Sequence, residues 1–232
     1  MCQPKAKPAK GRQALGQKAT TSRHIKSFHD FIQEFSMGII VQKYGGTSVA
    51  DLERIQHVAK RVIQTYDQGD NVVVILSAMA GVTDKLINLA NEVTKKPDRR
   101  ELDVLLATGE QTTAALLAMM LRSMDYPAAS LMGYQADVVT DCEFGNARII
   151  EIGGGRIEEL LRKRAIVVIA GFQGHDTRGN ITTLGRGGSD TSAVAIAAAL
   201  KADVCEIYTD VDGIYTADPN ICSKARKLKE IS

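Results

Sequence analysis

The sequence contains no tryptophan, and its aromatic residues make up only 5% of the chain. Proteins that bind single-stranded nucleic acid rely on aromatic side chains against which the bases stack. The body of the chain also lacks a basic excess. Residues 1–36 carry seven Lys or Arg against two acids, a charge of +5, whereas the rest carries 22 against 25, a charge of −3. The composition therefore argues against a nucleic-acid partner.

Cysteines and long apolar runs are equally scarce. The four cysteines form no CxxC pair and are too scattered for a zinc site (Cys2, Cys142, Cys205 and Cys222). The longest apolar runs, such as 114–121, fall well short of the roughly 20 residues that span a bilayer. We therefore expect a soluble cytoplasmic protein with reduced thiols, without a metal site of its own and without a membrane partner.

Residues 1–36 are polar and basic and show no clear periodicity before about residue 28. We predict a disordered tail over 1–36, followed by a folded domain over 37–232. Three explanations of the tail stay open. It is a start site assigned too far upstream, a native or added tail, or an organelle transit peptide, since it is basic and poor in acids.

From residue 37 the pattern alternates between strands and helices. Short apolar runs predict strands over 39–41, 72–76, 166–170 and 204–209, of which the last three read as buried strands. Apolar residues at helical spacing predict a helix over 49–65. The segments 81–94 and 102–124 also read as helices, the latter with a possible break near Gly109, and 190–201 is an Ala-rich helix. This alternation indicates an α/β sandwich with a mainly parallel sheet. In such sheets the ligand site lies beyond the carboxyl ends of the strands.

Two glycine-bearing turns precede predicted helices. Lys43-Tyr44-Gly45-Gly46-Thr47-Ser48 has glycines that let backbone N–H groups approach phosphate oxygens, and a lysine that adds a full charge. The plain alternative is a strand-to-helix turn with a surface lysine. In Gly185-Arg186-Gly187-Gly188-Ser189-Asp190, Ser189 or Asp190 is a candidate helix cap, while the Arg fork suits a carboxylate or phosphate.

Three further features stand out. The string over 208–219 holds several acids, which are either turn formers or part of a nucleotide pocket. Glu110 lies among Leu and Ala residues, so it either faces water or has a cationic partner such as a substrate amine.

Ser77 follows the strand over 72–76. Its hydroxyl either contacts a ligand there or belongs to an ordinary turn. The sequence has no P-loop, Rossmann, protein-kinase or GxSxG signature.

Three strings taken together are far more specific than any one of them. They are VQKYGGTS over 41–48, TLGRGGSD over 183–190 and TDVDGIYTADP over 209–219. Their order and separation resemble the bacterial aspartokinases of the amino-acid kinase family. Ser77-Ala78-Met79 and Thr108-Gly109-Glu110 fit the same family. The resemblance covers about 37–232.

The resemblance implies a three-layer α/β/α sandwich, incomplete at the C-terminus, and transfer of the γ-phosphoryl group of ATP to the β-carboxylate of L-aspartate. The product would be 4-phospho-L-aspartate, in the first step toward lysine, threonine and methionine. ATP is then a substrate, and Mg²⁺ arrives with it. The acceptor carboxylate is ionised at neutral pH, so no general base is required. The protein must bring two anionic substrates together and stabilise the negative charge of the transferring phosphoryl group.

The same resemblance implies roles for individual residues. Lys43 and the amides of Gly45 and Gly46 stabilise the transferring phosphoryl group, Arg186 clamps a substrate carboxylate, and Glu110 accepts the α-ammonium group. The residues that orient the substrate are Thr47, Ser77 and Ser189, while Asp190 holds the amine or caps its helix. The nucleotide-binding set is Lys43, Tyr44, Gly45, Gly46, Gly187, Gly188, Thr209, Asp210, Tyr215 and Asp218.

Two departures from the family matter. Asn220 stands where the family usually has Arg, which puts a phosphate contact in doubt. Aspartokinases also continue beyond the point matched by Ser232, with a lysine that contacts ATP and with regulatory ACT domains. We therefore expect a truncated catalytic domain that forms a homo-oligomer or associates with the missing C-terminal part.

Alternative functions stay open. They are a related kinase acting on acetylglutamate, glutamate or UMP, a non-catalytic chain that binds nucleotide, and an inert fragment that folds poorly.

Overall fold

A computed structural model describes residues 37–185, 187–209, 216, 222 and 224–226. The chain divides into two units, 1–36 and 37–232, and the description below concerns the second. The predicted tail over 1–36 lies outside the described residues.

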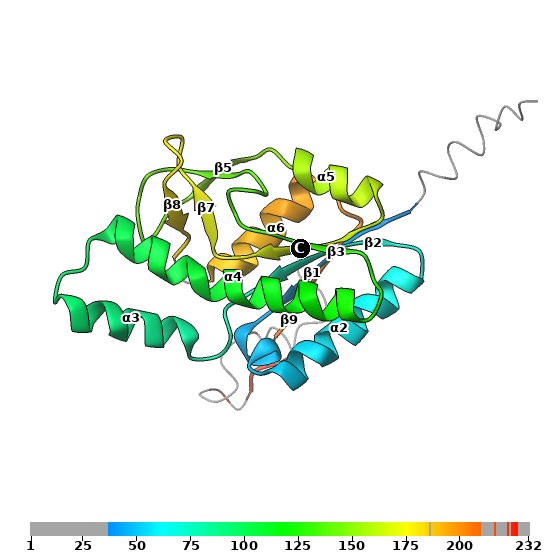
Figure 1. Cartoon of the computed structure of the whole chain (residues 1–232), viewed down its shortest axis with the longest axis horizontal. Helices are drawn as coiled ribbons and strands as arrows, with labels where there is room; N and C mark the ends of the chain where they lie inside the picture. The colour runs from blue at the N-terminus through cyan, green and yellow to red at the C-terminus, as the bar shows by residue number, and fades with distance from the viewer. Residues whose placement is uncertain (1–36, 186, 210–215, 217–221, 223, 227–232) are drawn as a thin grey trace, which may run out of the picture. The chain divides into compact units, whose positions relative to one another are not determined.

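A five-stranded sheet, sheet A, forms the centre of the fold (Figure 1). Its strands are β1 (Ile39–Tyr44), β2 (Asn71–Leu76), β3 (Ala128–Leu131), β6 (Ile166–Ala170) and β9 (Val204–Tyr208), in the order β3-β6-β2-β1-β9. Every pairing in sheet A is parallel. The mainly parallel sheet predicted from the sequence is therefore confirmed, and the carboxyl ends of β2, β1 and β9 lie next to one another.

Helices cover both faces of sheet A, which explains why its inner strands are apolar on both sides. Helices α2 (Leu52–Asp67) and α4 (Arg99–Ser123) pack on one face, where Ile55 and Leu117 share a core with Val74. Helices α5 (Gly155–Arg162) and α6 (Gly188–Ala199) cover the other face. These three layers are the predicted α/β/α sandwich. Helix α3 (Val82–Val93) packs against α4.

A second sheet, sheet B, was not predicted from the sequence. It consists of β4 (Val138–Thr140), β5 (Ile149–Ile152), β7 (Gln173–His175) and β8 (Ile181–Thr183), in the order β5-β4-β7-β8. It mixes antiparallel and parallel pairs. Its strands have three or four residues each, too few to show a two-residue hydrophobic period.

Helix α4 corrects the expected break near Gly109, because it runs unbroken from Arg99 to Ser123. A Cβ on Gly109 would lie 2.9 Å from the Cβ of Ala78, so this glycine serves close packing against the loop after β2. Among the described residues, α4 is the one helix long and apolar enough to cross a membrane by length and composition. Half of that stretch is buried within the fold.

One boundary and one burial prediction also differ from expectation. The helix predicted over 49–65 begins at Leu52. Asp51 caps this helix, because its side chain accepts a hydrogen bond from the backbone N–H of Arg54. The strand predicted as buried near 204–209 lies at the edge of sheet A in the described part of the chain. Val204 and Ile207 are 44% and 43% exposed, since among the described residues β9 pairs with β1 alone.

A buried acid on α4 joins that helix to sheet B. Asp103 is fully buried, and its carboxylate accepts hydrogen bonds from the backbone N–H and the hydroxyl of Thr183 in β8, at 2.8 Å each. It also accepts the backbone N–H of Gly145 at 3.0 Å. A buried carboxylate is tolerated where hydrogen bonds stabilise its charge. Asp103 therefore fixes the start of α4 beside β8.

Replacing Asp103 by Ala should lower the free energy of unfolding by about 3 kcal/mol. The backbone N–H groups of Gly145 and Thr183 would then lose their hydrogen-bond acceptor. Urea unfolding followed by circular dichroism measures this loss. The matched control is Glu92→Ala on the exposed side of α3, for which we expect a change within about 0.5 kcal/mol. Equal effects of the two substitutions would contradict the bridging role of Asp103.

Candidate active site

A cavity of about 360 Å³ opens at the carboxyl ends of β1 and β2 and the N-terminus of α6. This volume falls in the range of small-molecule sites. Five segments distant in sequence line the cavity: the end of β1, the loop after β2 with the start of α3, the middle of α4, the loop after β6, and the turn before α6 with its first residues. Its lining residues are Lys43, Gly46, Ser77, Ala78, Met79, Ala80, Gly81, Thr83, Asp84, Glu110, Phe172, Gly185, Gly187, Gly188, Ser189 and Asp190.

An ion pair stands at one wall of this cavity. The Lys43 ammonium lies 2.6 Å from Oδ1 of Asp190, and the lysine side chain is 9% exposed against 49% for the aspartate. Lys43 reaches the cavity from β1, while Asp190 lies in the first turn of α6. A lysine this buried needs a counter-charge. Asp190 thus holds the ammonium at the cavity wall near the N-terminus of α6.

The cap expected for α6 is wrong. The helix begins at Gly188, and its N-cap is Gly187, which makes no side-chain cap. Gly187 has a φ of 76°, a left-handed conformation that favours glycine. Neither Ser189 nor Asp190 therefore caps the helix. The N-terminus of α6 lines the cavity, where the helix dipole favours an anion. Two N–H groups of its first turn, those of Gly188 and Asp190, donate to the carbonyls of Gly185 and Gly187.

Glycine is required in the turn after β1 for a different reason. A Cβ at Gly46 would lie 2.8 Å from the carbonyl oxygen of Ala78, so a side chain there would push the two loops apart. The neighbouring amide of Gly45 donates to the carbonyl of Tyr208 at 3.3 Å. In this structure the Gly45 N–H is engaged by β9, and Gly46 is the residue of the pair that lines the cavity.

Glu110 contributes a buried carboxyl group to the opposite wall. It is 4% exposed, and its Oε1 accepts the backbone N–H of Ala78 at 3.0 Å. Its Oε2 is buried and has no hydrogen-bond partner among the described residues. Burial raises the pKa of Glu110 to about 7, against the lowering effect of the Ala78 N–H. The side chain neither faces water nor pairs with a cation in the described part of the chain.

The predicted site residues fall into three groups. The cavity brings together Lys43, Gly46, Ser77, Glu110, Gly187, Gly188, Ser189 and Asp190. Tyr44, Gly45, Thr47 and Thr209 do not line it. Arg186, Asp210, Tyr215 and Asp218, like Asn220, lie outside the described residues.

Strand alternation separates Tyr44 from Lys43. Successive side chains of a strand point to opposite faces, so Lys43 reaches the cavity while Tyr44 points to the face covered by α2. There the Tyr44 ring stacks on Tyr208, with centroids 4.7 Å apart. Tyr44 and Thr209 line a second cavity of about 280 Å³, together with Ser48, Arg54, His57, Val58, Arg61 and Tyr208.

Sequence reasoning did not name several lining residues. Thr83 and Asp84 lie in the first turn of α3, directly after the loop that follows β2, so extending that loop by one turn would have found them. Phe172 gave no signal in the sequence. Its φ of 66° is uncommon for a bulky residue, and its backbone N–H donates to the hydroxyl of Ser192 at 3.1 Å.

Comparison with known proteins defines the class to which this fold and cavity belong. The profile of the amino acid kinase family matches residues 38–232, and the chain belongs to that family. An aspartokinase from Geobacillus stearothermophilus is 58% identical over 196 residues, which cover 84% of this chain and 48% of that protein. The chain thus spans about half the length of the curated relatives it matches.

Solved structures agree with this assignment. An aspartate kinase from Synechocystis is 50% identical with a TM-score of 0.69, over 81% of this chain and 31% of that one. Aspartokinase III from E. coli, in complex with aspartate and ADP, is 30% identical with a TM-score of 0.71, over 82% of this chain and 53% of that one.

The raised pKa of Glu110 predicts a pH-dependent stability. Between its ordinary pKa of 4.5 and about 7, the folded protein holds a proton that the unfolded chain releases, so stability falls as pH rises through this window. The loss amounts to roughly 3 kcal/mol at 1.36 kcal/mol per pKa unit. Glu110→Gln removes the titration, so its stability relative to the parent should rise by that amount between pH 4.5 and 8.

Urea unfolding at a series of pH values measures this difference. Glu101→Gln, an exposed change near the start of the same helix, is the control and should show little dependence on pH. A difference between Glu110→Gln and the parent that stays constant from pH 4.5 to 8 would contradict the raised pKa.

Proposed function

We propose that this chain is the substrate-binding part of an aspartate kinase. The reaction transfers the γ-phosphoryl group of ATP to the β-carboxylate of L-aspartate and gives 4-phospho-L-aspartate, the first step toward lysine, threonine and methionine. One observation carries the proposal. A single cavity sets the Lys43 ammonium and the N-terminus of α6 against the buried, partly unpaired carboxyl group of Glu110. The relatives named aspartokinase support the choice of acceptor.

The two walls of the cavity bind different substrates. Glu110 accepts the α-ammonium group of aspartate through its unpartnered Oε2, and Ser77 and Ser189 orient the rest of that molecule. Lys43, the Gly46 amide and the start of α6 receive the phosphates of ATP. The clamp of Arg186 on a substrate carboxylate, and the contacts of Asp210, Tyr215 and Asp218 with the nucleotide, rest on the sequence resemblance.

This arrangement suits phosphoryl transfer to a carboxylate. Both reactants are anions, and the acceptor needs no base, so the protein must supply position and positive charge. Asp190 holds the Lys43 ammonium in place before the substrates arrive. Mg²⁺ binds through substrate phosphates and keeps several waters, so we expect it to enter with ATP. Asp84 and Asp190 line the cavity and are the acidic residues that would hold the hydrated ion there. A cytoplasmic location belongs to the same proposal.

A substrate panel tests the reaction. With ATP present, hydroxylamine trapping should detect an acyl phosphate from L-aspartate and none from N-acetylglutamate or glutamate. Product from N-acetylglutamate alone would show that the chain acts as a related kinase and not as an aspartate kinase. A second candidate function is nucleotide binding without turnover. Calorimetry that shows binding of an ATP analogue, with no product from any acceptor, would support that candidate.

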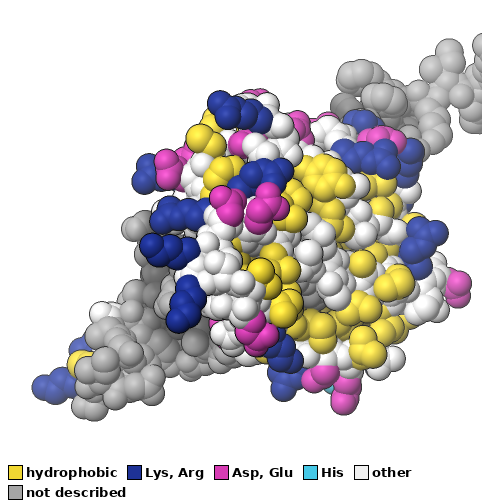
Figure 2. Space-filling model, turned by 60° about the vertical axis from the view of Figure 1, so that its left-hand side comes forward, with side chains coloured by type: hydrophobic (Ala, Val, Ile, Leu, Met, Phe, Trp, Pro, Cys, Tyr) yellow, Lys and Arg dark blue, Asp and Glu magenta, His cyan; other side chains and the backbone are white. Residues whose placement is uncertain are grey.

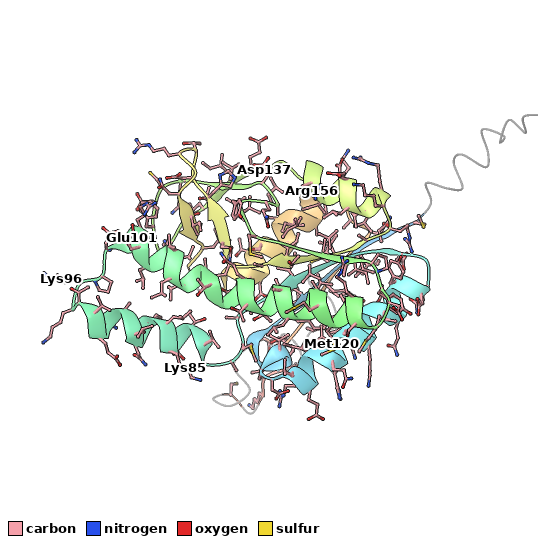
Figure 3. The ribbon with its side chains drawn as sticks, in the orientation of Figure 1. Lys85, Lys96, Glu101, Met120, Asp137 and Arg156 are labelled. Carbon is pink, nitrogen blue, oxygen red and sulfur yellow. The ribbon has the colours of Figure 1, made fainter. Side chains whose placement is uncertain are left out.

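Removing the cavity's buried ammonium should slow the reaction. Lys43→Met removes the charge that faces the transferring group, and kcat should fall by about 100-fold or more, as for loss of a single oxyanion donor. The control is Lys85→Met on the exposed side of α3, which should leave kcat unchanged (Figure 3). An unaltered kcat in Lys43→Met would remove this residue from the mechanism.

Aspartate binding should release protons near neutral pH. Because Glu110 has a pKa of about 7, it is partly protonated there, and an incoming ammonium group favours its charged form. Calorimetric titrations in buffers of different ionisation enthalpy measure this release. In Glu110→Gln the release should vanish, and KM for aspartate should rise at least about tenfold. An unchanged KM together with unchanged proton release would contradict the assignment.

A further inference from the structure

Phe172, in the loop between β6 and β7, has a backbone conformation that aromatic residues avoid. Its φ is 66°, in the left-handed region, where the Cβ atom of a bulky residue lies too close to the carbonyl oxygen that follows it. Strained residues persist only where their surroundings determine the conformation, and they cluster at ligand sites. The other described non-glycine residues with a positive φ are polar and do not line the cavity: Asp125, Asp137, Arg164 and Lys201.

The partial exposure of Phe172 is not informative by itself. Figure 2 brings forward the side on which α3 and the start of α4 lie in Figure 1, and apolar side chains gather across its middle and right. Apolar atoms contribute more than half of the surface of ordinary folded proteins. Phe172 differs from such surface residues because it lines the cavity, and in the described part of the chain it belongs to neither apolar core of sheet A. Its ring therefore serves the cavity and not the packing of the sheet.

One buried hydroxyl group joins Phe172 to the first turn of α6. Ser192 is 2% exposed, and its Oγ accepts the backbone N–H of Phe172 at 3.1 Å. The same hydroxyl donates to the carbonyl of Gly188 at 2.9 Å. Ser192 thus connects two segments that line the cavity, the loop after β6 and the start of α6. Removing the hydroxyl would take the hydrogen-bond acceptor from the Phe172 N–H, which is costly for a donor turned away from water.

Backbone hydrogen bonds fix the chain on either side of the Ser192 contact. The N–H of Gly171 donates to the carbonyl of Leu76, at the end of β2, at 2.9 Å. The N–H of Leu184, directly after β8, donates to the carbonyl of Phe172 at 2.8 Å. A Cβ at Gly171 would lie 3.0 Å from the Leu76 carbonyl oxygen, so the loop passes very close to β2. These bonds hold the loop to the two sheets, and the Ser192 hydroxyl holds it to α6.

The ring of Phe172 lies directly against the backbone at the start of α6. A Cβ at Gly188 would lie 2.8 Å from Cδ2 of Phe172, so a side chain at this position would displace the ring. Gly188 and Ser189 line the cavity together with Phe172, where the helix dipole favours an anion. An apolar ring beside this N-terminus limits the space that an acidic substrate has along the cavity wall.

We propose that Ser192 is a positioning residue that holds Phe172 in its left-handed conformation, and that the Phe172 ring limits the length of the acidic acceptor. This inference rests on the proposed function, because it concerns the acceptor of the same reaction. L-Glutamate has one methylene more than L-aspartate, so its side-chain carboxylate extends further from the ammonium group and meets the ring. One methylene changes kcat/KM by roughly 10- to 200-fold in an apolar pocket.

Acceptor preference tests the role of the ring. Phe172→Ala should make L-glutamate a detectable acceptor, with kcat/KM at least about tenfold above that of the parent. Phe172→Leu, a milder shortening, should act in the same direction. Ser192→Ala should also raise kcat/KM for L-glutamate relative to L-aspartate, by a smaller factor, because the ring is then less firmly held. Ser192→Thr keeps the hydroxyl and should keep the preference of the parent.

Thr191→Ala is the matched control for the loss of the Ser192 hydroxyl. The Thr191 hydroxyl also donates to the carbonyl four residues earlier, that of Gly187 at 3.3 Å, but it is exposed on α6. Its removal should leave the ratio of kcat/KM for the two acids unchanged. A role of Ser192 in stability alone would lower kcat/KM for both acids by the same factor, and that result would overturn its role in positioning.

Hydrogen exchange tests the Ser192 contact without any substrate. In Ser192→Ala the amide of Phe172 should exchange at least about tenfold faster than in the parent, measured by NMR, whereas Thr191→Ala and Ser192→Thr should keep the rate of the parent. Circular dichroism melting shows that each variant folds. An unchanged exchange rate in Ser192→Ala overturns the positioning role, whether or not the chain is active.

The outcomes separate this inference from the proposed function. A parent chain that neither binds nor phosphorylates L-aspartate contradicts the proposed function and the role of the ring together. A parent that phosphorylates L-aspartate, with Phe172→Ala and Phe172→Leu variants that fold and still reject L-glutamate, overturns the role of the ring alone.

Discussion

The position of β1 inside a parallel sheet is the constraint on which the site depends. Because β1 pairs in parallel with both β2 and β9, the loops that follow the three strands emerge at one edge. Lys43 and Tyr44 pair with Ile75 and Leu76 in β2, and with Ile207 and Tyr208 in β9. A shift of this register by one residue would turn the Lys43 side chain to the face of α2 and leave the cavity without its ammonium group.

Buried charge is the second organising feature. Three of the four buried charged side chains in the described part of the chain are stabilised in different ways. Asp103 is surrounded by donors and serves as a structural bridge. Lys43 is held by Asp190 across the cavity wall. Glu110 has one backbone donor and one empty oxygen, so its charged form is the least stabilised of the three. Incomplete stabilisation of a buried group is a cost to folding that a ligand can recover, which is why Glu110 marks the site.

The sequence predicts the parts of this fold that local patterns encode. Continuous apolar runs identified β2 and β6, and apolar residues at helical spacing identified α2, because these patterns arise from burial on both faces of a sheet or on one side of a helix. Helix α6 was identified by its alanine content. Sheet B escaped prediction, since strands as short as Gln173–His175 are fixed by tertiary pairing. The break expected at Gly109 failed for a related reason, because its close contact with Ala78 is a long-range one.

The site was predictable to a similar extent. Glycine-bearing turns after a strand and before a helix located both Gly46 and Gly187, since such turns have a backbone signature. The Lys43–Asp190 pair was not predictable, because it joins two of these turns across space. Phe172 lacked any local signal, and its place depends on a backbone conformation that only the folded chain reveals.

Helix α4 connects these features, because it is anchored near its start and presents a functional group further along. Asp103 is bonded to Gly145 and Thr183, and Glu110 lies about two turns further on, at the cavity. The helix runs unbroken from Arg99 to Ser123, so it is stiff over this distance. The hydrogen bonds of Asp103 therefore help to fix the backbone that presents Glu110, and the carboxyl group is held in position before a substrate arrives.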